Sequence, residues 1–583
     1  MTRLVLFSQT AQLDNFPLEA GDRLVPLNDA AIDDLEKRGL VHRMADLPDL
    51  GPLQAESLSE AFETAKAILA ALDGDLSWRK ILCYKRYDLR PMALKNLFFA
   101  LEDVARVYRL AMIVRAAHPG SQAILLDDDP VIRRAVGLPD SRALLAVPLQ
   151  MRQRMQPILR FGRDRWQMMR AKQDRLAAEA SNVRPVIVFL DAPHRARLMA
   201  RTLALLAEHY PIHNARLYDW SWPADLSFFP ADTYAWNAYP LLGSAARIAR
   251  HVLASRAGTR LEAFDIPGRA WLPPHLLWML RYDDIQRYAN MIEALEGLAR
   301  AQHPALWITL EDLFAFGKCA AAVGEKYGIP TLNVQHGIIG AYPYRTGVDV
   351  VGTFAAFGEA SRQTLIERGA DPARIVVTGP VRYDDILELK PDREAMLREE
   401  HLDPVRPVIL FASQPTRRLI TPAVKRLALR ALLEGAGQIG VQVIIKTHPL
   451  EDDPVLDEVL AEFDQHVPIV REQLYEWLLI SDIMATISST VVYEAAMAER
   501  PALVLEWSGN SDVAGYREQG IAHLPESPEQ TGDAIRRLLA DESVRAAMLA
   551  QQRAFVQHHL AGNDGKASER LAVLARRLIE EGT

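Results

Sequence analysis

Short apolar runs recur along the C-terminal half of the chain, and segments with helical spacing separate them. The runs at residues 408–412, 441–445, 483–487 and 502–505 each end at small or polar residues. Strands that are buried on both faces of a parallel sheet have this pattern, because helices cover both faces. We therefore predict a parallel sheet in this half of the chain, with helices between its strands.

A second series of apolar runs lies nearer the N-terminus. Runs at residues 186–190, 306–310, 329–334, 350–357 and 374–380 alternate with helix-like segments. Alternation of strands and helices at short spacing predicts a second parallel sheet with covering helices. The fold class expected from both series is α/β, with two Rossmann-like domains that face one another across a cleft.

Two segments of the N-terminal half interrupt this alternation. Residues 150–180 carry Arg, Gln and Met at helical spacing, which predicts a helix that packs in the core or between domains. Residues 210–303 are rich in Trp, Tyr and Pro, which predicts an irregular aromatic-rich insertion with helical parts. Its aromatic side chains either cover a cleft and recognise the face of a sugar, or pack under long loops.

The polar segment 381–407, which contains three prolines, marks the expected domain boundary. We predict an N-terminal domain over residues 1–390 and a C-terminal domain over residues 405–562. Residues 563–583 are predicted to form a helix that packs back on the first domain. The elements predicted in the first 126 residues are strands at 4–7 and 123–126 and helices at 58–71 and 92–118.

The composition is that of an ordinary globular protein, with 49% hydrophobic and 24% charged residues among 583. A net charge of −8 without a basic block argues against a nucleic-acid partner, because phosphates require a cationic surface. The two cysteines, Cys83 and Cys319, support neither a disulfide framework nor a zinc site. No apolar run reaches the roughly 18 residues of a membrane helix. We expect a cytoplasmic protein, with peripheral association at the inner face of the membrane left open.

Polar residues follow several strands of the predicted C-terminal sheet where those strands end. In open α/β sheets, ligands bind just beyond the carboxyl ends of the strands, so these residues are expected to meet at one edge. The residues assigned to ligand binding in this domain are Ser413, Arg417, Arg418, Lys446, His448, Pro449, Ser488, Ser489, Thr490 and Glu494.

The hydroxyl run Ser488-Ser489-Thr490 has the features of an anion site. We predict that Ser488 caps the helix that follows, which leaves the next N–H groups directed at an anion. Glu494 lies one helical turn beyond Thr490, where its carboxylate is placed to accept hydrogen bonds from ribose hydroxyls. A phosphate at the helix start and sugar hydroxyls one turn deeper describe a nucleotide.

The first sheet supplies the expected catalytic group. Gln335-His336-Gly337 follows the strand at 329–334, and we assign Gln335 and Gly337 to donor binding. A neutral imidazole accepts a proton near pH 7, so His336 is the expected general base. No metal is required where helix N–H groups and a histidine stabilise a leaving phosphate. The alternative bases at strand ends, among which the sequence does not choose, are Asp191, Glu311 and Asp312.

The motifs QHG, TGPVRYD, KTHP and TISSTVVYEAA occur in this order between residues 306 and 570. Together they resemble the GT-B glycosyltransferases of bacterial surface-polysaccharide synthesis, namely the capsule-type sialyl and Kdo transferases with HP and SS motifs and the related CDP-glycerol glycerophosphotransferases. The resemblance implies that His448, Pro449, Ser488, Ser489 and Thr490 bind the phosphate and sugar of a cytidine nucleotide.

It also implies a GT-B glycosyltransferase that needs neither a metal nor a cofactor. The donor would be a nucleotide-activated sugar, with a CMP-linked acidic sugar favoured, and the acceptor a surface glycan or a lipid-linked glycan. The C-terminal domain would bind the donor, and the N-terminal domain would lie on the acceptor side.

Other functions stay open on the sequence. A CDP-glycerol-type glycerophosphotransferase and a non-catalytic nucleotide-sugar-binding protein are two of them. UDP-sugar 2-epimerases share the two-sheet architecture, but their helix begins with an acidic-Ser-Gly-Gly motif that residues 487–490 lack. The first 180 residues form an acceptor module, part of the first sheet, or a partner-binding region.

Overall fold

The structure is a computed structural model of the chain, and its described residues fall into two compact units. One unit comprises Met1–Ala55, Leu110–Asp127 and Tyr383–Gly565, and the other comprises Glu56–Arg109, Asp128–Arg382 and Lys566–Thr583. The structure describes residues 2–45, 50–126, 130–138, 187–310, 315–339 and 352–582, apart from gaps at 15, 29–30, 33, 36–37, 191–192, 218–228, 231–233, 239–243, 254–271, 273–275, 281–283, 338, 417–419, 450, 452–453 and 508–514.

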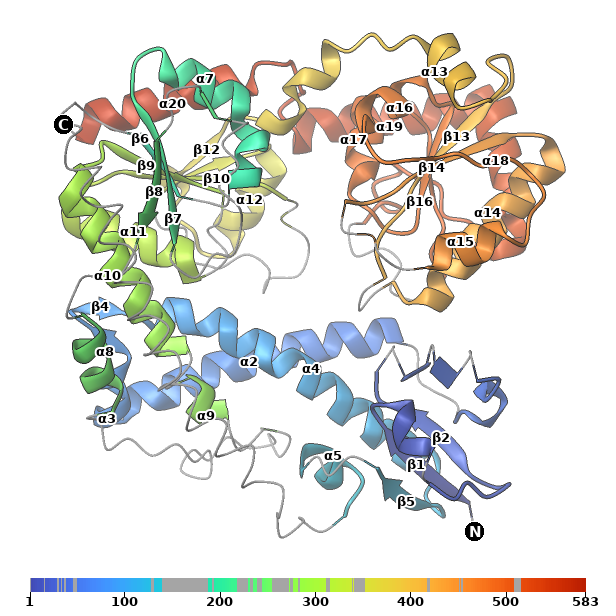
Figure 1. The fold of residues 1–583 in the computed structure, drawn as a ribbon, viewed down its shortest axis with the longest axis horizontal. Helices are drawn as coiled ribbons and strands as arrows, with labels where there is room; N and C mark the ends of the chain where they lie inside the picture. The colour runs from blue at the N-terminus through green and yellow to red at the C-terminus, as the bar shows by residue number, and fades with distance from the viewer. Residues whose placement is uncertain are drawn as a thin grey trace. The chain divides into compact units, whose positions relative to one another are not determined.

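The C-terminal part of the first unit is built on a five-stranded sheet with strand order β15-β14-β13-β16-β17 (Figure 1). All neighbouring strands are parallel. The strands are β13 (Val408–Ala412), β14 (Gln442–Lys446), β15 (Ile469–Val470), β16 (Ile483–Thr486) and β17 (Ala502–Val504). The predicted parallel sheet of this half is confirmed.

Helices α14 (Pro422–Ile439), α15 (Val455–Leu460) and α18 (Thr531–Ala540) pack their apolar residues on this sheet. Two glycines allow α14 and α18 to approach closely. A Cβ on Gly435 would lie 2.8 Å from the backbone nitrogen of Gly532, so any larger residue would push the helices apart. This packing holds α14, whose first turn reaches the site described below.

The second unit is built on a seven-stranded sheet with strand order β12-β11-β10-β9-β6-β7-β8. Its pairs are all parallel, which confirms the second predicted sheet and the α/β fold class with two Rossmann-like domains. The strands are β6 (Ile187–Phe189), β7 (Ile212–Leu217), β8 (Tyr234–Ala238), β9 (Leu306–Thr309), β10 (Thr331–Val334), β11 (Thr353–Ala356) and β12 (Ile375–Val377).

The segment 210–303 differs from the expected irregular insertion, because it supplies two strands of this sheet. β7 and β8 extend the sheet beyond β6, and α10 (Ile285–Gln302) is buried along most of its length. Within β7, the polar residues His213 and Asn214 are both buried, at 8% and 0% exposure. No continuous apolar run therefore marks this strand in the sequence.

The two faces of the seven-stranded sheet are covered by different helices. Ile187 and Phe189 of β6 pack with α7 (Ala200–Ala207) and α20 (Ala567–Gly582). Val188, on the opposite face of β6, packs with α10 and α11 (Ala315–Tyr327). The last helix of the chain, α20, is thus part of the core of the second unit, where Arg201 of α7 pairs with Glu569 at 2.8 Å.

The N-terminal residues form a small sheet of their own. Three parallel strands pair in the order β2-β1-β5, and a two-stranded hairpin, β3-β4, is separate from them. The first 180 residues therefore add no strand to the seven-stranded sheet among those described. The elements are β1 (Arg3–Phe7), β2 (Arg23–Pro26), α2 (Leu50–Gly74), β3 (Cys83–Tyr84), β4 (Tyr87–Asp88), α4 (Arg90–Ala117) and β5 (Gln122–Leu125).

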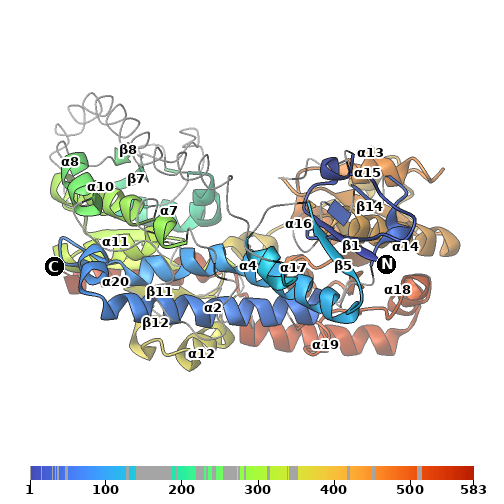
Figure 2. The same cartoon turned by 90° about the horizontal axis from the view of Figure 1, so that it is seen from below.

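Two long helices, α2 and α4, connect these strands. They lie side by side (Figure 2) and share a hydrophobic core. Arg109 of α4 pairs with Glu56 and Glu60 of α2 at 2.5 and 2.6 Å. None of the described helices is long and apolar enough to cross a membrane. The helix predicted at residues 150–180 lies outside the described residues.

Helix α10 carries two fully buried carboxylates, Glu293 and Glu296. Lys85, in the turn between β3 and β4, forms ion pairs with both. Tyr87 Oη donates a hydrogen bond to Glu296 at 2.9 Å, and Lys326 Nζ of α11 pairs with Glu296 at 2.7 Å. The buried carboxylates therefore join the β3-β4 hairpin to α10 and α11.

Acid is expected to weaken this cluster. Burial by itself raises the pKa of Glu296, but hydrogen bonds from Lys326, Lys85 and Tyr87 outweigh it and lower the pKa from 4.5 to about 2. The folded state thus holds the ionised form, which stabilises the fold above pH 4.5, and this contribution is lost as the pH falls from 4.5 towards 2. The loss is on the order of 3 kcal/mol.

Thermal unfolding followed between pH 6 and pH 2 on wild type and Glu296→Gln measures this contribution. The melting temperature of the wild type should fall more steeply over the acid range than that of the variant. Parallel curves would show that Glu296 is not held ionised by its neighbours.

Candidate functional site at the edge of the C-terminal sheet

The polar residues at the carboxyl edge of the five-stranded sheet belong to the loops after β13, β14 and β16. Because the strands are parallel, their carboxyl ends lie along one edge. Ser413 and Gln414 directly follow β13, His448 follows β14 after one residue, and Ser488 follows β16 after one residue. Side-chain hydrogen bonds join these three loops, so motifs far apart in the sequence form one local structure.

Glu451 joins the β13 loop to the β14 loop. Its Oε1 accepts hydrogen bonds from Ser413 Oγ and Lys425 Nζ, both at 2.6 Å. Its Oε2 accepts a hydrogen bond from the backbone N–H of His448 at 2.8 Å. The side chains of Lys425 and Glu451 are only 0% and 3% exposed. This buried ion pair is therefore completed by two further donors, which offset the cost of removing the carboxylate from water.

Gln414 joins the β13 loop to the β16 loop. Its Oε1 accepts hydrogen bonds from Thr486 Oγ1 at 3.2 Å and from the backbone N–H of Ser488 at 2.8 Å. Neither Gln414 nor Glu451 was predicted from the sequence. A single Gln or Glu near a strand end belongs to no motif. The only indication in the sequence was that Gln414 lies next to Ser413 and that Glu451 lies three residues after His448.

The structure corrects the predicted cap of the helix after β16. The helix α17 (Val491–Met497) begins later than expected, and its N-cap residue is Thr490, whose backbone is helical and whose side chain forms no capping hydrogen bond. Ser488 is not the cap, because the helix begins two residues later than a cap at Ser488 requires. Its N–H is bound to Gln414. Ser489 Oγ instead accepts a hydrogen bond from the N–H of Val491 at 3.3 Å.

Glu494, which the sequence predicted to contact a ribose, is buried in the structure. Its side chain is only 1% exposed on the inner face of α17. Burial, followed by the charge of Glu494, raises the pKa of the neighbouring Tyr493. Tyr516 Oη donates a hydrogen bond to the carbonyl of Ser489 at 3.1 Å, and its ring packs edge-on against Tyr493. Tyr516 thus links the 488–490 loop to Tyr493 of α17.

The other predicted donor residues of this domain differ in exposure. His448 and Pro449 are exposed at the sheet edge. Lys446 is 8% exposed, and its Nζ donates to the carbonyl of Thr447 at 2.8 Å. Its ammonium group is therefore engaged by its own loop. Arg417 and Arg418 lie outside the described residues.

In the second unit, Gln335-His336-Gly337 follows β10, as the sequence predicted. The Gln335 amide is engaged within the protein. Its Nε2 donates to the carbonyl of Gly337 at 2.8 Å, and its Oε1 accepts from the N–H of Phe357 at 2.8 Å. The carbonyl of His336 accepts a hydrogen bond from Arg382 Nη1 at 3.2 Å. Gln335 therefore shapes the loop that carries His336.

The alternative bases Asp191, Glu311 and Asp312 lie outside the described residues. Among the residues that the structure does describe, no three His, Cys, Asp or Glu side chains gather closely enough to hold a metal ion.

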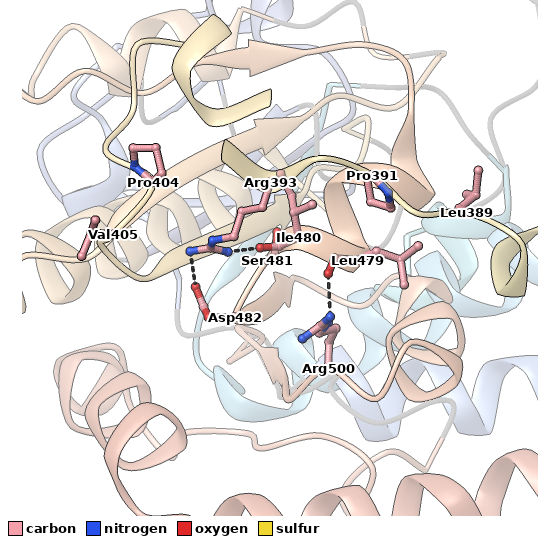
Figure 3. A pocket seen from close by; sticks show the side chains of 10 residues that line it. All are labelled: Leu389, Pro391, Arg393, Pro404, Val405, Leu479, Ile480, Ser481, Asp482 and Arg500. Atoms are coloured by element: carbon pink, nitrogen blue, oxygen red, sulfur yellow. Dashed lines mark hydrogen bonds and ion pairs between the residues drawn. The ribbon is translucent and has the colours of Figure 1, made fainter. Parts of the chain in front are cut away.

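A pocket of about 490 Å³ lies at the opposite, amino-terminal edge of the five-stranded sheet (Figure 3). It is lined by Asp482 just before β16, Arg500 just before β17 and Arg393 from the segment before β13. Arg393 pairs with Asp482 at 3.0 Å, and Arg500 donates to the carbonyl of Leu479 at 2.6 Å. No predicted donor residue lines this pocket, so it is not the predicted site.

One protein-family model matches part of this chain. The model of the family described as UDP-N-acetylglucosamine 2-epimerase matches residues 285–574, a span that includes the whole five-stranded sheet. A search of the curated proteins found no match. The family match corresponds to one of the alternatives that the sequence left open.

Solved structures with a similar fold include two epimerases and a polymerase. The UDP-GlcNAc 2-epimerase of Neisseria meningitidis, bound to UDP-GlcNAc, is 15% identical, with a TM-score of 0.45 and coverage of 67% of this chain and 100% of that chain. A putative UDP-N-acetylglucosamine 2-epimerase from Listeria monocytogenes is 15% identical, with a TM-score of 0.45 and coverage of 68% and 98%.

The wall teichoic acid polymerase TagF is 14% identical, with a TM-score of 0.42 and coverage of 74% of this chain and 98% of that chain. At these identities the likenesses concern the fold. The family model matches just under half of this chain, in the part that contains the five-stranded sheet.

Proposed function

We propose that this chain is a glycosyltransferase whose nucleotide-sugar donor binds at the carboxyl edge of the five-stranded sheet. The observation that carries the proposal is the joining of the β13, β14 and β16 loops through Glu451 and Gln414. Loops joined in this way hold backbone N–H groups and hydroxyls in fixed positions, as recognition of phosphate and ribose requires. The family match over residues 285–574 supports a nucleotide sugar as the ligand.

The donor that we place first is a CMP-linked acidic sugar, followed by CDP-glycerol and a UDP-sugar. The cytidine donors follow from the resemblance carried by the KTHP and TISST motifs. The UDP-sugar gains support from the family match. We propose a surface glycan or a lipid-linked glycan as the acceptor, and no metal or cofactor.

The proposed reaction joins an acceptor hydroxyl to the sugar. The acceptor oxygen forms a bond to the anomeric carbon, while the bond from that carbon to the donor phosphate breaks. The nucleotide leaves with the electron pair of that bond, and a base takes the acceptor proton. We propose His336 as this base, with Asp191, Glu311 and Asp312 as alternatives. Donors in the 488–490 loop would meet the charge on the leaving phosphate.

His448→Ala and Ser489→Ala are each expected to weaken nucleotide binding about tenfold, the effect of losing one or two hydrogen bonds to a charged group. Titration calorimetry with CMP, CDP and UDP on wild type and both variants measures this effect. The nucleotide that binds the wild type most tightly also identifies the donor class.

His466→Ala is a matched control for His448→Ala. His466 is also exposed and lies in the same domain, but it precedes β15, and its Nε2 donates a hydrogen bond to the carbonyl of Glu400 at 2.9 Å. Its replacement should leave nucleotide affinity unchanged. If His448→Ala and Ser489→Ala also bind with wild-type affinity, the donor site is not at this edge.

A UDP-sugar 2-epimerase is the second candidate, and the family match is the observation that favours it. An epimerase would convert UDP-GlcNAc without any acceptor, whereas a transferase would release nucleotide only when a glycan acceptor is present. Incubation with UDP-GlcNAc alone, followed by separation of the two epimers, therefore tests the alternatives. Epimer formation without acceptor would replace the transferase proposal.

A further inference from the structure

Glu451 is buried beneath the β14 loop and belongs to none of the recognised motifs. We infer that Glu451 is a positioning residue: with Lys425 as its buried counter-charge, it holds the backbone of His448 where a donor phosphate binds. This inference rests on the proposed donor site. In this inference Glu451 acts on ligand binding through the β14 loop and does not touch the ligand.

The bonds of Glu451 come from three separate elements. Ser413 belongs to the β13 loop, Lys425 to the first turns of α14 and His448 to the β14 loop. The N–H of Glu451 also donates to the carbonyl of His448 at 3.0 Å. One carboxylate therefore sets the spacing between the sheet edge, the helix and the loop that carries the exposed imidazole.

Two other ion pairs join α14 to the segment around α15, and neither includes a residue of the β13 or β14 loop. Arg426 pairs with Glu458 at 2.8 Å, and Arg430 pairs with Glu462 at 2.6 Å. The Arg430–Glu462 pair is exposed, at 44% and 43%, and neither of its residues belongs to a strand-end loop. These two pairs therefore join α14 to the segment around α15 through residues outside the β14 loop.

A purely structural role and a positioning role predict different results when the buried pair is replaced by apolar residues. Apolar side chains of similar size can replace a buried ion pair without loss of stability, because no charge is left unpaired. If Glu451 only stabilises the domain, ligand binding will survive such a replacement. If it positions the loop, the domain will stay folded while binding weakens.

The test is the double variant Lys425→Met/Glu451→Leu, with Arg430→Gln/Glu462→Gln as the matched control. Three quantities are measured on the full chain: the melting temperature, the hydrogen exchange of the peptide covering residues 446–451, and the affinities for CMP, CDP and UDP. We expect a melting temperature near that of wild type, faster exchange in this peptide and an affinity at least about tenfold weaker. The control should match wild type in all three.

The outcomes separate the inference from the proposed function. Wild-type chain that binds none of the three nucleotides would overturn the donor site and, with it, the inference. Wild-type binding together with unchanged affinity or unchanged exchange in the folded double variant would overturn the inference alone. If the double variant does not fold, Ser413→Ala removes one donor to the carboxylate, and unchanged exchange of the 446–451 peptide would then overturn it.

Discussion

His336→Ala is expected to lower the rate of sugar transfer by about 100-fold or more while nucleotide affinity stays unchanged, because a general base contributes that much to proton transfer. The imidazole follows β10, in the second unit, whereas His448 and Ser489, the two nucleotide contacts tested above, follow β14 and β16 of the five-stranded sheet. The rate is measured as nucleotide release in the presence of acceptor, and the affinity by calorimetry.

The neighbouring residue supplies the control. Gln335→Ala removes the hydrogen bonds to Gly337 and Phe357 that shape the same loop. It should lower the melting temperature, which His336→Ala should not. If His336→Ala turns over at the wild-type rate, His336 is not the general base, and Asp191, Glu311 and Asp312 become the candidates. A variant that loses affinity and rate together would point to donor binding by His336 instead.

Glu296→Ala is expected to lower the free energy of unfolding by about 3 kcal/mol, at the lower end of the range for breaking a buried ion pair. The carboxylate is fully buried and is bonded to Lys85, Tyr87 and Lys326. The side chains of Lys85 and Lys326 are 24% and 44% exposed, so both can turn towards water when their partner is removed. The buried hydroxyl of Tyr87 would remain without its acceptor.

Chemical denaturation of wild type, Glu296→Ala and the surface variant Glu359→Ala measures this difference. Glu359 is half-exposed and pairs with Arg362 at 2.9 Å, so its removal should change stability by less than about 0.5 kcal/mol. Equal stabilities for Glu296→Ala and Glu359→Ala would mean that the buried cluster contributes no more than a surface ion pair.

The sequence predicted both parallel sheets correctly, because strands that are buried on both faces consist mainly of apolar residues. The runs that became β13, β14, β16 and β17 contain almost only apolar residues, and covering helices produce that pattern wherever a parallel sheet forms. The strands β7 and β8 carry a weaker signal in the sequence. β7 contains buried polar residues, and β8 reads YAWNA, so the segment 210–303 resembled loops rather than strands.

The helix after β16 starts two residues later than the sequence predicted. A serine before an apolar helix is a common N-cap, and the sequence favoured that interpretation. In the folded domain the Ser488 N–H is bound to Gln414, 74 positions earlier, and the helix begins at Val491. Local propensity does not choose among three consecutive hydroxyl residues, so it could not place the helix start to within two residues.

The sequence alone determined the α/β class, the two series of strands and the loops at which polar residues gather, because these depend on periodicity and on local order along the chain. Only the tertiary structure decided which side chains hold those loops. Glu451 and Lys425 meet through the packing of α14 on the sheet, and Glu296 meets Lys85 across 211 positions. Such contacts depend on how distant elements are brought together, which leaves no periodic trace in the sequence.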